Sequence, residues 1–186
     1  AHYKISKPIL IGYSLGGRLA MHYASMYPQS FSALILESAH PGFSDSEKSL
    51  VMAREQTRIR QHTQSLISLE LSDFLSNWYE QALFCRSKYL ISSADFLKKS
   101  RLSKSMLQSI LIELSSLNQH FFFDYIDLIK VPILYLYGAL DQKYCVISEQ
   151  FKSESNVYYY CIDEADHNCH LSQPVTFLSY INAFLR

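Results

Sequence analysis

One stretch near the start of the chain constrains the fold more than any other, and it reads PILIGYSLGGRLAMHYASMYP over residues 8–28. Its first part, residues 8–13, is an unbroken apolar run, which is typical of a strand buried on both faces of a parallel sheet. Its last part has helical spacing from Gly16 to about Met26 and ends before a proline. The stretch therefore predicts a buried strand, a sharp turn that carries Ser14 between two glycines, and a helix.

Three later apolar runs have the same strand-like character, at residues 33–37, 132–137 and 157–162. Helical patterns follow the second of these runs near 145–152 and the third over 174–186. Alternation of strand and helix implies right-handed crossover connections. We therefore predict an α/β fold with a mostly parallel sheet.

The interval between the second and third strand-like runs differs from the rest of the chain. It lacks strand-like runs and shows helical periodicity, for example at Leu66, Leu69 and Phe74. We predict three to five helices here, inserted as a cap over one end of the sheet. The predicted organisation is a core segment over 1–43, a helical insertion over 44–123 and a second core segment over 124–186.

The turn that carries Ser14 has the pattern G-x-S-x-G after a strand and before a helix, which is the nucleophile elbow of α/β-hydrolases. Its glycines let the backbone crowd together while the serine takes a strained conformation that exposes its hydroxyl. The helix directs its N-terminal dipole at the site, and the amide of Leu15 is placed to donate to a developing oxyanion. The pattern predicts a catalytic serine.

An acid and a histidine follow at the ends of later strands, in the order that this fold requires. Asp141 comes after the strand at 132–137, and His167 comes shortly after the strand at 157–162. Taken singly, a turn aspartate and a loop histidine are both common. Because open α/β sheets place their ligands at the carboxyl ends of the strands, the three together predict a Ser14–His167–Asp141 triad.

Composition excludes several other classes of protein. The chain has 17 basic and 17 acidic residues, which argues against nucleic-acid binding or attachment to anionic lipid by a global positive charge. No apolar run approaches the roughly 20 residues that span a bilayer. Four cysteines without C-x-x-C spacing favour reduced thiols, a cytoplasmic protein and no metal site. Cys145, Cys169 and His170 as zinc ligands are a weak alternative, because they lack the C-x₂₋₄-C spacing of such sites.

Five segments together resemble one family, and they read GYSLGGRLA, LESAHPG, NWYEQALF, GALDQKYC and DHNCHLSQP. The chain is similar to 2-succinyl-6-hydroxy-2,4-cyclohexadiene-1-carboxylate synthase of menaquinone biosynthesis, an α/β-hydrolase-fold lyase. The resemblance runs from Pro8 to the C-terminus and is weakest over 87–122. It implies elimination of pyruvate from a cyclohexene dicarboxylate intermediate, with no metal or organic cofactor. Ser14, activated by His167 and Asp141, would remove a ring proton without forming an acyl-enzyme.

Residues that would bind the anionic small-molecule substrate are also indicated. Arg18 lies about one helical turn after Ser14, where its guanidinium would grip a carboxylate. Lys143 and Trp78 match family positions, Tyr13 would line the pocket, and either Arg54 or Arg58 would match a family arginine, with the register left open. The ordinary alternatives are solvated surface charges and a core tryptophan.

The sequence departs from the family pattern at two places. Asp166 stands before His167 where the family usually has glycine. The chain opens with alanine close to a core strand, so we expect it to be a C-terminal part of an α/β-hydrolase fold. The missing N-terminal segment would supply earlier strands and a His-Gly loop of the oxyanion hole, and without it we expect an exposed apolar strand and poor solubility.

Two other functions stay open at this point. One is a small-molecule esterase or C–C bond hydrolase in which Ser14 is a true nucleophile. The other is a truncated, inactive remnant that has lost catalysis. A cluster of cations favours the lyase, because an ester hydrolase needs no such cluster, and the triad pattern argues against the remnant.

Overall fold

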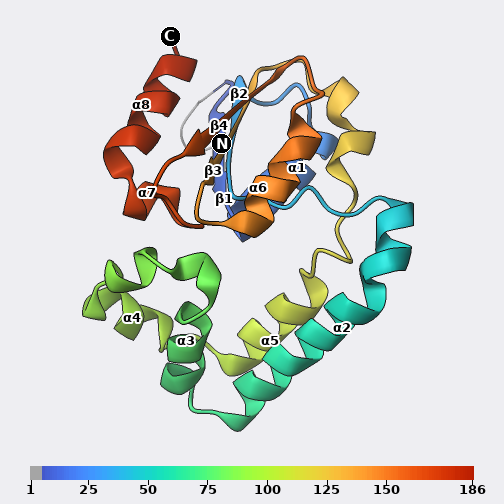
Figure 1. Cartoon of the computed structure of the whole chain (residues 1–186). Coiled ribbons are helices and arrows are strands. Elements are labelled where there is room, and N and C mark those ends of the chain that lie inside the picture. The colour runs from blue at the N-terminus through green and yellow to red at the C-terminus, as the bar shows by residue number, and fades with distance from the viewer. Residues whose placement is uncertain (1–5) are drawn as a thin grey trace. The chain divides into compact units, whose positions relative to one another are not determined.

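A computed structural model describes residues 6–186, so the first five residues of the predicted segment 1–43 lie outside the described part (Figure 1). The chain divides into two compact units. The sheet unit comprises the described residues up to Pro41 together with Ala82–Ser87 and Phe122–Arg186, and the helical unit comprises Gly42–Gln81 and Lys88–Phe121. Residues 82–87, inside the range predicted for the insertion, therefore group with the sheet.

The sheet has four parallel strands in the order β1-β2-β3-β4, which confirms the predicted α/β fold class. The strands are β1 (Ile9–Tyr13), β2 (Ala33–Glu37), β3 (Ile133–Gly138) and β4 (Val157–Ile162), each within one residue of its prediction. β2 and β3 are buried along their whole length, which explains why their sequences are continuously apolar rather than alternating.

Helices cover both faces of this sheet (Figure 1). On one face, α1 (Leu15–Met26) and α6 (Gln142–Ser148) pack with Leu34 and Leu36 of β2. On the other, α7 (Cys169–Ser172) and α8 (Pro174–Phe184) pack with Ile35 and with alternate residues of β3. This split follows from the two-residue period of a strand. Short 3₁₀ turns complete the unit at Ala82–Phe84, Phe122–Asp124, Ile126–Leu128 and Glu149–Phe151, and a further one begins at its boundary, Ser87–Tyr89.

The α8 face is incompletely covered over β1. Ile9 and Ile11 lie beside Ala33 and Ile35 in the parallel register, and they are 41% and 61% exposed. α8 packs on β3 and β4 instead. An apolar strip of the sheet, Ile9 with Ile11, is therefore open in the described residues.

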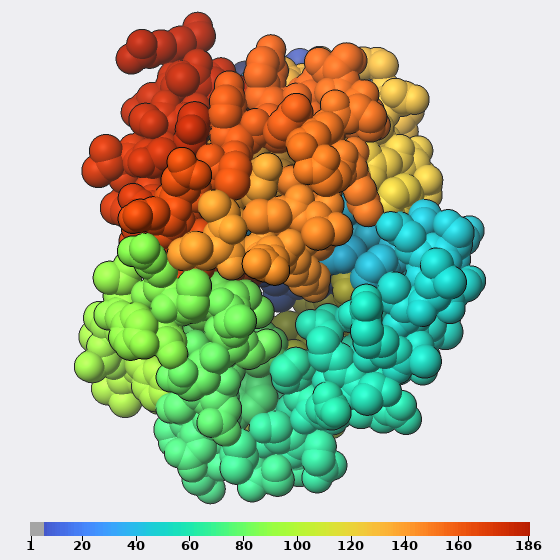
Figure 2. Space-filling view, in the orientation of Figure 1, coloured from blue at the N-terminus to red at the C-terminus, as the bar shows by residue number. Residues whose placement is uncertain are grey.

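The helical unit consists of α2 (Asp45–Ser68), α3 (Leu71–Tyr79), α4 (Ser93–Lys99) and α5 (Lys104–Glu113). A capping box starts α2, because the Ser44 hydroxyl accepts from the Glu47 amide while the Glu47 carboxylate accepts from the Ser44 amide. The unit has its own small core around Leu66 and Phe74. Figure 2 shows α2 in cyan to teal and the residues that follow it in green. The four helices agree with the predicted number, and their position as a cap over the sheet stays a prediction.

Candidate active site

Ser14 occupies a strained turn between β1 and α1. Its φ is 47° and its ψ is −112°, a left-handed conformation that costs energy for a residue with a side chain. Two main-chain bonds hold the turn: the Ser14 N–H donates to the Glu37 carbonyl at 2.8 Å, and its carbonyl accepts from the Arg18 N–H at 3.1 Å. Hydrogen bonds to β2 and at the start of α1 therefore hold the Ser14 backbone in this strained conformation.

The close approach behind this turn depends on Gly12 and Gly17. A Cβ on Gly12 would lie 2.5 Å from the Gly17 Cα, and a Cβ on Gly17 would lie 2.5 Å from the Ala39 Cβ and 2.9 Å from the Gly12 carbonyl oxygen. Gly16, the last glycine of the G-x-S-x-G pattern, has open space at the same position. The motif predicts that its own two glycines lie in close contact with neighbouring backbone. The structure shows close contacts at the first of them, Gly12, and at Gly17, which directly follows the motif.

His167 lies between Asp141 and Ser14. Its Nδ1 is 2.7 Å from Asp141 Oδ2, and its Nε2 is 2.9 Å from Ser14 Oγ. The carboxylate accepts from Nδ1–H, which leaves Nε2 as the acceptor for the serine hydroxyl. The structure thus brings together the three predicted residues from the ends of three strands in the geometry of a Ser-His-Asp relay.

Both partners of this relay are held in a nearly dry environment. Asp141 is 2% exposed and His167 is 4% exposed. Asp141 is also the N-cap of α6, where its Oδ1 accepts from the Tyr144 amide at 3.3 Å. The rings of Tyr13, Phe84 and Tyr144 lie within 6 Å of the imidazole ring. Packing on several sides therefore limits rotation of the imidazole.

The groups that would receive negative charge lie in the first turns of α1 and α6. Leu15 is the first residue of this helix, so its amide is among those with no acceptor inside the helix. Arg18 follows one turn later and is half-buried. Lys143 begins the turn after Asp141, is exposed, and places its Nζ 5.5 Å from the centre of the Tyr144 ring. Their roles in binding remain predictions.

The other predicted binding residues lie in the helical unit. Arg58 donates through Nε and Nη2 to Glu55, whose side chain is buried, and Arg54 is mostly exposed with its Nε 3.6 Å from the same carboxylate. The Trp78 ring packs against His62 at 5.1 Å. Burial, and secondarily the charge of Arg58, lower the pKa of His62. The contact with substrate predicted for the two arginines and Trp78 stays a prediction.

Two buried acids lie near the relay, Glu37 and Asp166, and neither is among the predicted site residues. Glu37, at the end of β2, accepts from both the amide and Nδ1 of His170 at 2.8–3.0 Å, and the Tyr13 ring contacts the rings of both histidines. Asp166 accepts hydrogen bonds from main-chain amides. The sequence offered a signal for each acid: Glu37 stands at the end of a buried strand, and Asp166 stands directly before the predicted catalytic histidine. Only the second signal was recognised from the sequence.

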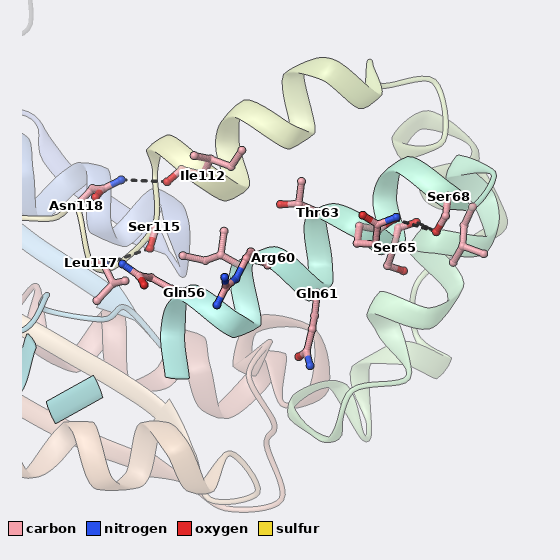
Figure 3. Close-up of a pocket in the computed structure, with 13 residues that line it drawn as sticks. Gln56, Arg60, Gln61, Thr63, Ser65, Ser68, Ile112, Ser115, Leu117 and Asn118 are labelled. Atoms are coloured by element: carbon pink, nitrogen blue, oxygen red, sulfur yellow. Dashed lines mark hydrogen bonds between the residues drawn. The ribbon is translucent and has the colours of Figure 1, made fainter. Parts of the chain in front are cut away.

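A separate groove of about 1240 Å³ lies in the helical unit between α2 and the segment from Ile112 to Asn118 (Figure 3). Eight of its thirteen lining residues carry a side-chain amide or hydroxyl, such as Gln56, Thr63 and Asn118, and one is a cation, Arg60. Among its lining residues there is no carboxylate, imidazole or thiol, so the groove holds no acid–base pair.

Within residues 6–186, no cluster of three metal-ligating side chains was found, and no helix is long and apolar enough to cross a membrane.

Comparison with known proteins identifies the family. The sequence model of the alpha/beta hydrolase fold matches residues 1–174. A Bacillus subtilis (strain 168) protein, provisionally named a 2-succinyl-6-hydroxy-2,4-cyclohexadiene-1-carboxylate synthase, is 32% identical over 187 residues, covering 98% of this chain and 67% of the relative. This chain belongs to that synthase family. The synthase of Enterobacter sp. (strain 638) is 28% identical, with 99% of this chain and 69% of the relative covered.

Solved structures match the synthase-family chain in fold. A structure of MenH from S. aureus has a TM-score of 0.82 over 96% of this chain and 68% of that one, at 24% identity. A bromoperoxidase from Bacillus anthracis has a TM-score of 0.74 over 99% of this chain and 69% of that one, at 16% identity. At these identities the likeness shows the α/β-hydrolase fold alone, which proteins of different chemistry share.

Proposed function

We propose that this member of the synthase family is a lyase of menaquinone biosynthesis that eliminates pyruvate from a cyclohexene dicarboxylate intermediate. One observation carries the proposal: His167 lies within hydrogen-bond distance of both Asp141 and Ser14, in a chain that belongs to this family. The relay supplies a base, and the family supplies the reaction on which a base would act.

The proposed step is a proton abstraction followed by loss of a leaving group. His167 Nε2 accepts the hydroxyl proton of Ser14 while Ser14 Oγ removes a proton from the substrate ring. The electron pair released forms a new ring double bond, and the C–O bond to the three-carbon group breaks. The leaving group departs as the enolate of pyruvate, and the proton held by His167 is available to neutralise it. Asp141 stabilises the imidazolium that forms in between.

Recognition of the two carboxylates is assigned to the cations of the chain. Arg18 on α1 is the nearest in sequence to Ser14, and the Leu15 amide with the dipole of α1 would favour negative charge beside it. Lys143, Arg54 or Arg58, Trp78 and Tyr13 complete the proposed binding set.

The direct test is release of pyruvate from the freshly prepared intermediate, followed with a lactate dehydrogenase coupling assay. We expect turnover by the wild-type chain, and loss by Ser14→Ala and His167→Gln of at least about 1,000-fold. Intact mass after a short incubation should show no covalent adduct. Accumulation of an acyl-enzyme with an activated ester and no pyruvate release would instead favour a hydrolase with Ser14 as nucleophile. Failure of both reactions would favour an inactive remnant.

We also infer that the open strip of Ile9 and Ile11 is covered when the family's N-terminal region pairs with β1. An uncovered apolar strand favours self-association, so Ile11→Lys should reduce light scattering of the 186-residue chain. Turnover should rise when a peptide or fused segment supplies this region, because one oxyanion donor alone contributes about 100–1,000-fold. A monodisperse, fully active 186-residue chain would contradict this inference.

The cytoplasm is the proposed compartment, since all four cysteines are free thiols.

A further inference from the structure

Asp166 is a fully buried acid immediately before His167. It is 0% exposed, and both of its carboxylate oxygens accept main-chain hydrogen bonds. Oδ2 accepts from the amides of Arg86 at 2.9 Å and Ser87 at 2.7 Å, and Oδ1 accepts from the amide of Asn168 at 3.1 Å. The Ser172 hydroxyl also donates to Oδ1, at 3.3 Å, and a carboxylate has acceptor sites for all four donors.

These bonds join two segments that are 80 residues apart in the sequence, the turn at 82–87 and the loop that carries His167. Three further contacts run between the same segments. The His167 amide donates to the Leu83 carbonyl at 3.0 Å, the Asn168 side chain donates to Ser87 Oγ at 3.0 Å, and the Phe84 ring meets the His167 ring edge-on at 5.8 Å. Asp166 is therefore the charged centre of a clasp, which we define as residues 83–87 with 166–168.

The clasp determines where the imidazole ring lies. The hydrogen bond from the His167 amide to the Leu83 carbonyl holds the main chain of His167. The same turn also positions the Phe84 ring against the imidazole ring of His167. Without the carboxylate, the amides of Arg86 and Ser87 would point into a buried space with no acceptor, which is costly. The turn would then move away to reach water, and its contacts with His167 would loosen.

We propose that Asp166 is a positioning residue for His167: through the turn at 82–87 it holds the imidazole at the distances required for proton transfer with Ser14. It acts through His167 and does not touch the substrate. This inference rests on the proposed function of the relay and adds a residue to it. A displacement of about 1 Å in a catalytic group can cost on the order of 100-fold in rate, so the effect of the clasp should be large.

The neighbouring acid Glu164 provides a matched control. It lies in the same loop, and its carboxylate also meets Arg86, at 3.6 Å from Nη2, but both side chains are largely exposed. An exposed ion pair of this kind contributes little. Glu164→Gln therefore removes a negative charge two residues from Asp166, and with it an exposed contact to the Arg86 side chain, but leaves every hydrogen bond of the clasp in place.

The experiment compares Asp166→Asn, Asp166→Ala and Glu164→Gln with the wild-type chain. Asp166→Asn keeps the volume but turns an NH₂ group toward a main-chain donor, and Asp166→Ala removes all acceptors. We expect both to lower kcat for pyruvate release by about 10- to 100-fold while KM changes by less than about threefold, because substrate contacts are untouched. Formate, a small carboxylate, should raise kcat of Asp166→Ala and leave the wild type unchanged. Glu164→Gln should behave as wild type.

A second readout needs no substrate and separates this inference from the proposed function. The ¹H–¹⁵N imidazole signals of His167, assigned by their loss in His167→Gln, report its hydrogen bonds to Asp141 and Ser14. They should shift in both Asp166 variants, move back with formate, and stay in place in Glu164→Gln. Unchanged signals in folded Asp166→Asn would overturn the positioning role, whether or not the wild type releases pyruvate. Absence of pyruvate release with shifted signals would count against the reaction and still support the clasp.

Discussion

Exchanging Gly17 for alanine should destabilise the sheet unit, and the same exchange at its neighbour Gly16 should not. Both glycines lie in the first turn of α1, so their intrinsic helix preferences are similar. Their surroundings differ: a Cβ at Gly17 meets the buried Ala39 Cβ at 2.5 Å and the Gly12 carbonyl oxygen at 2.9 Å, whereas a Cβ at Gly16 meets nothing within 4 Å.

The size of the effect follows from these distances. Non-bonded carbons settle at about 3.5–4.0 Å, so α1 or the segment that carries Ala39, just after β2, would have to move by about 1 Å or more. Overpacking of this kind costs about 1–3 kcal/mol. We expect Gly17→Ala to lie near the upper end of this range, because one of the atoms that the new Cβ meets is the main-chain oxygen of Gly12, which cannot move by a change of rotamer. Alanine regains up to about 1 kcal/mol of helix preference at either position. The two variants should therefore differ by about 2–3 kcal/mol, or roughly 4–12 °C in Tm for a chain of this size.

Thermal and urea unfolding, followed by circular dichroism, measure this difference directly. We expect Gly16→Ala to unfold at or slightly above the wild-type temperature and Gly17→Ala clearly below it. Because a shift of α1 also moves Ser14, Gly17→Ala should lose turnover as well. If Gly17→Ala melted with or above Gly16→Ala, the close approach of α1 to Gly12 and Ala39 would be refuted, and with it this account of the elbow.

Three further predictions concern the relay, the substrate and the helical unit. Asp141→Asn should lower kcat for pyruvate release by at least about 100-fold, because it removes the charged acceptor 2.7 Å from the histidine; activity within threefold of wild type would contradict the relay. Arg18→Ala should raise KM by about 10- to 100-fold, the equivalent of one lost charged hydrogen bond, with a smaller fall in kcat; a change confined to kcat would argue against a binding role. Burial and Arg58 lower the pKa of His62 from 6.5, so the unfolded chain takes up this proton first as pH falls. Stability is therefore fully present above about pH 6.5 and decreases below it, and His62→Asn should flatten the fall in the urea midpoint between pH 7.5 and 5.5; an equal fall in both proteins would exclude His62 as its source.

The local parts of the fold could be predicted from short stretches of sequence. Continuous apolar runs identified β1 to β4 within one residue. The burial on both faces that such runs predict was correct for β2 and β3 but wrong for β1 and β4, which lie at the edges of the described sheet and leave most of their residues exposed or only partly buried. Ser14, Asp141 and His167 could be selected because each directly follows one of these strands, and parallel strands bring their carboxyl ends to one edge. The resemblance to the synthase family was carried by the same segments and is confirmed by the comparisons.

Other features had no local signal. The G-x-S-x-G pattern marks Gly16, yet it is Gly17 that packs against Ala39, because the angle at which α1 leaves the turn is decided by the whole strand–helix interface. Either Arg54 or Arg58 was predicted to contact substrate, and no local pattern indicated that the guanidinium of Arg58 is hydrogen-bonded to the buried Glu55. Likewise, Asp166 was recognised as a departure from glycine that could tighten the turn or alter the surroundings of the imidazole, but its contacts with residues 86 and 87 had no local signal.

The sequence alone therefore determined which residues sit at strand ends and in what order, because periodicity and turn chemistry act over a few neighbouring residues. The tertiary structure decided which amides a buried carboxylate would meet, which glycine had no room for a side chain, and which faces of the relay histidine are packed. These properties depend on distances between segments up to 153 residues apart, such as Ser14 and His167, and no local pattern encodes such distances.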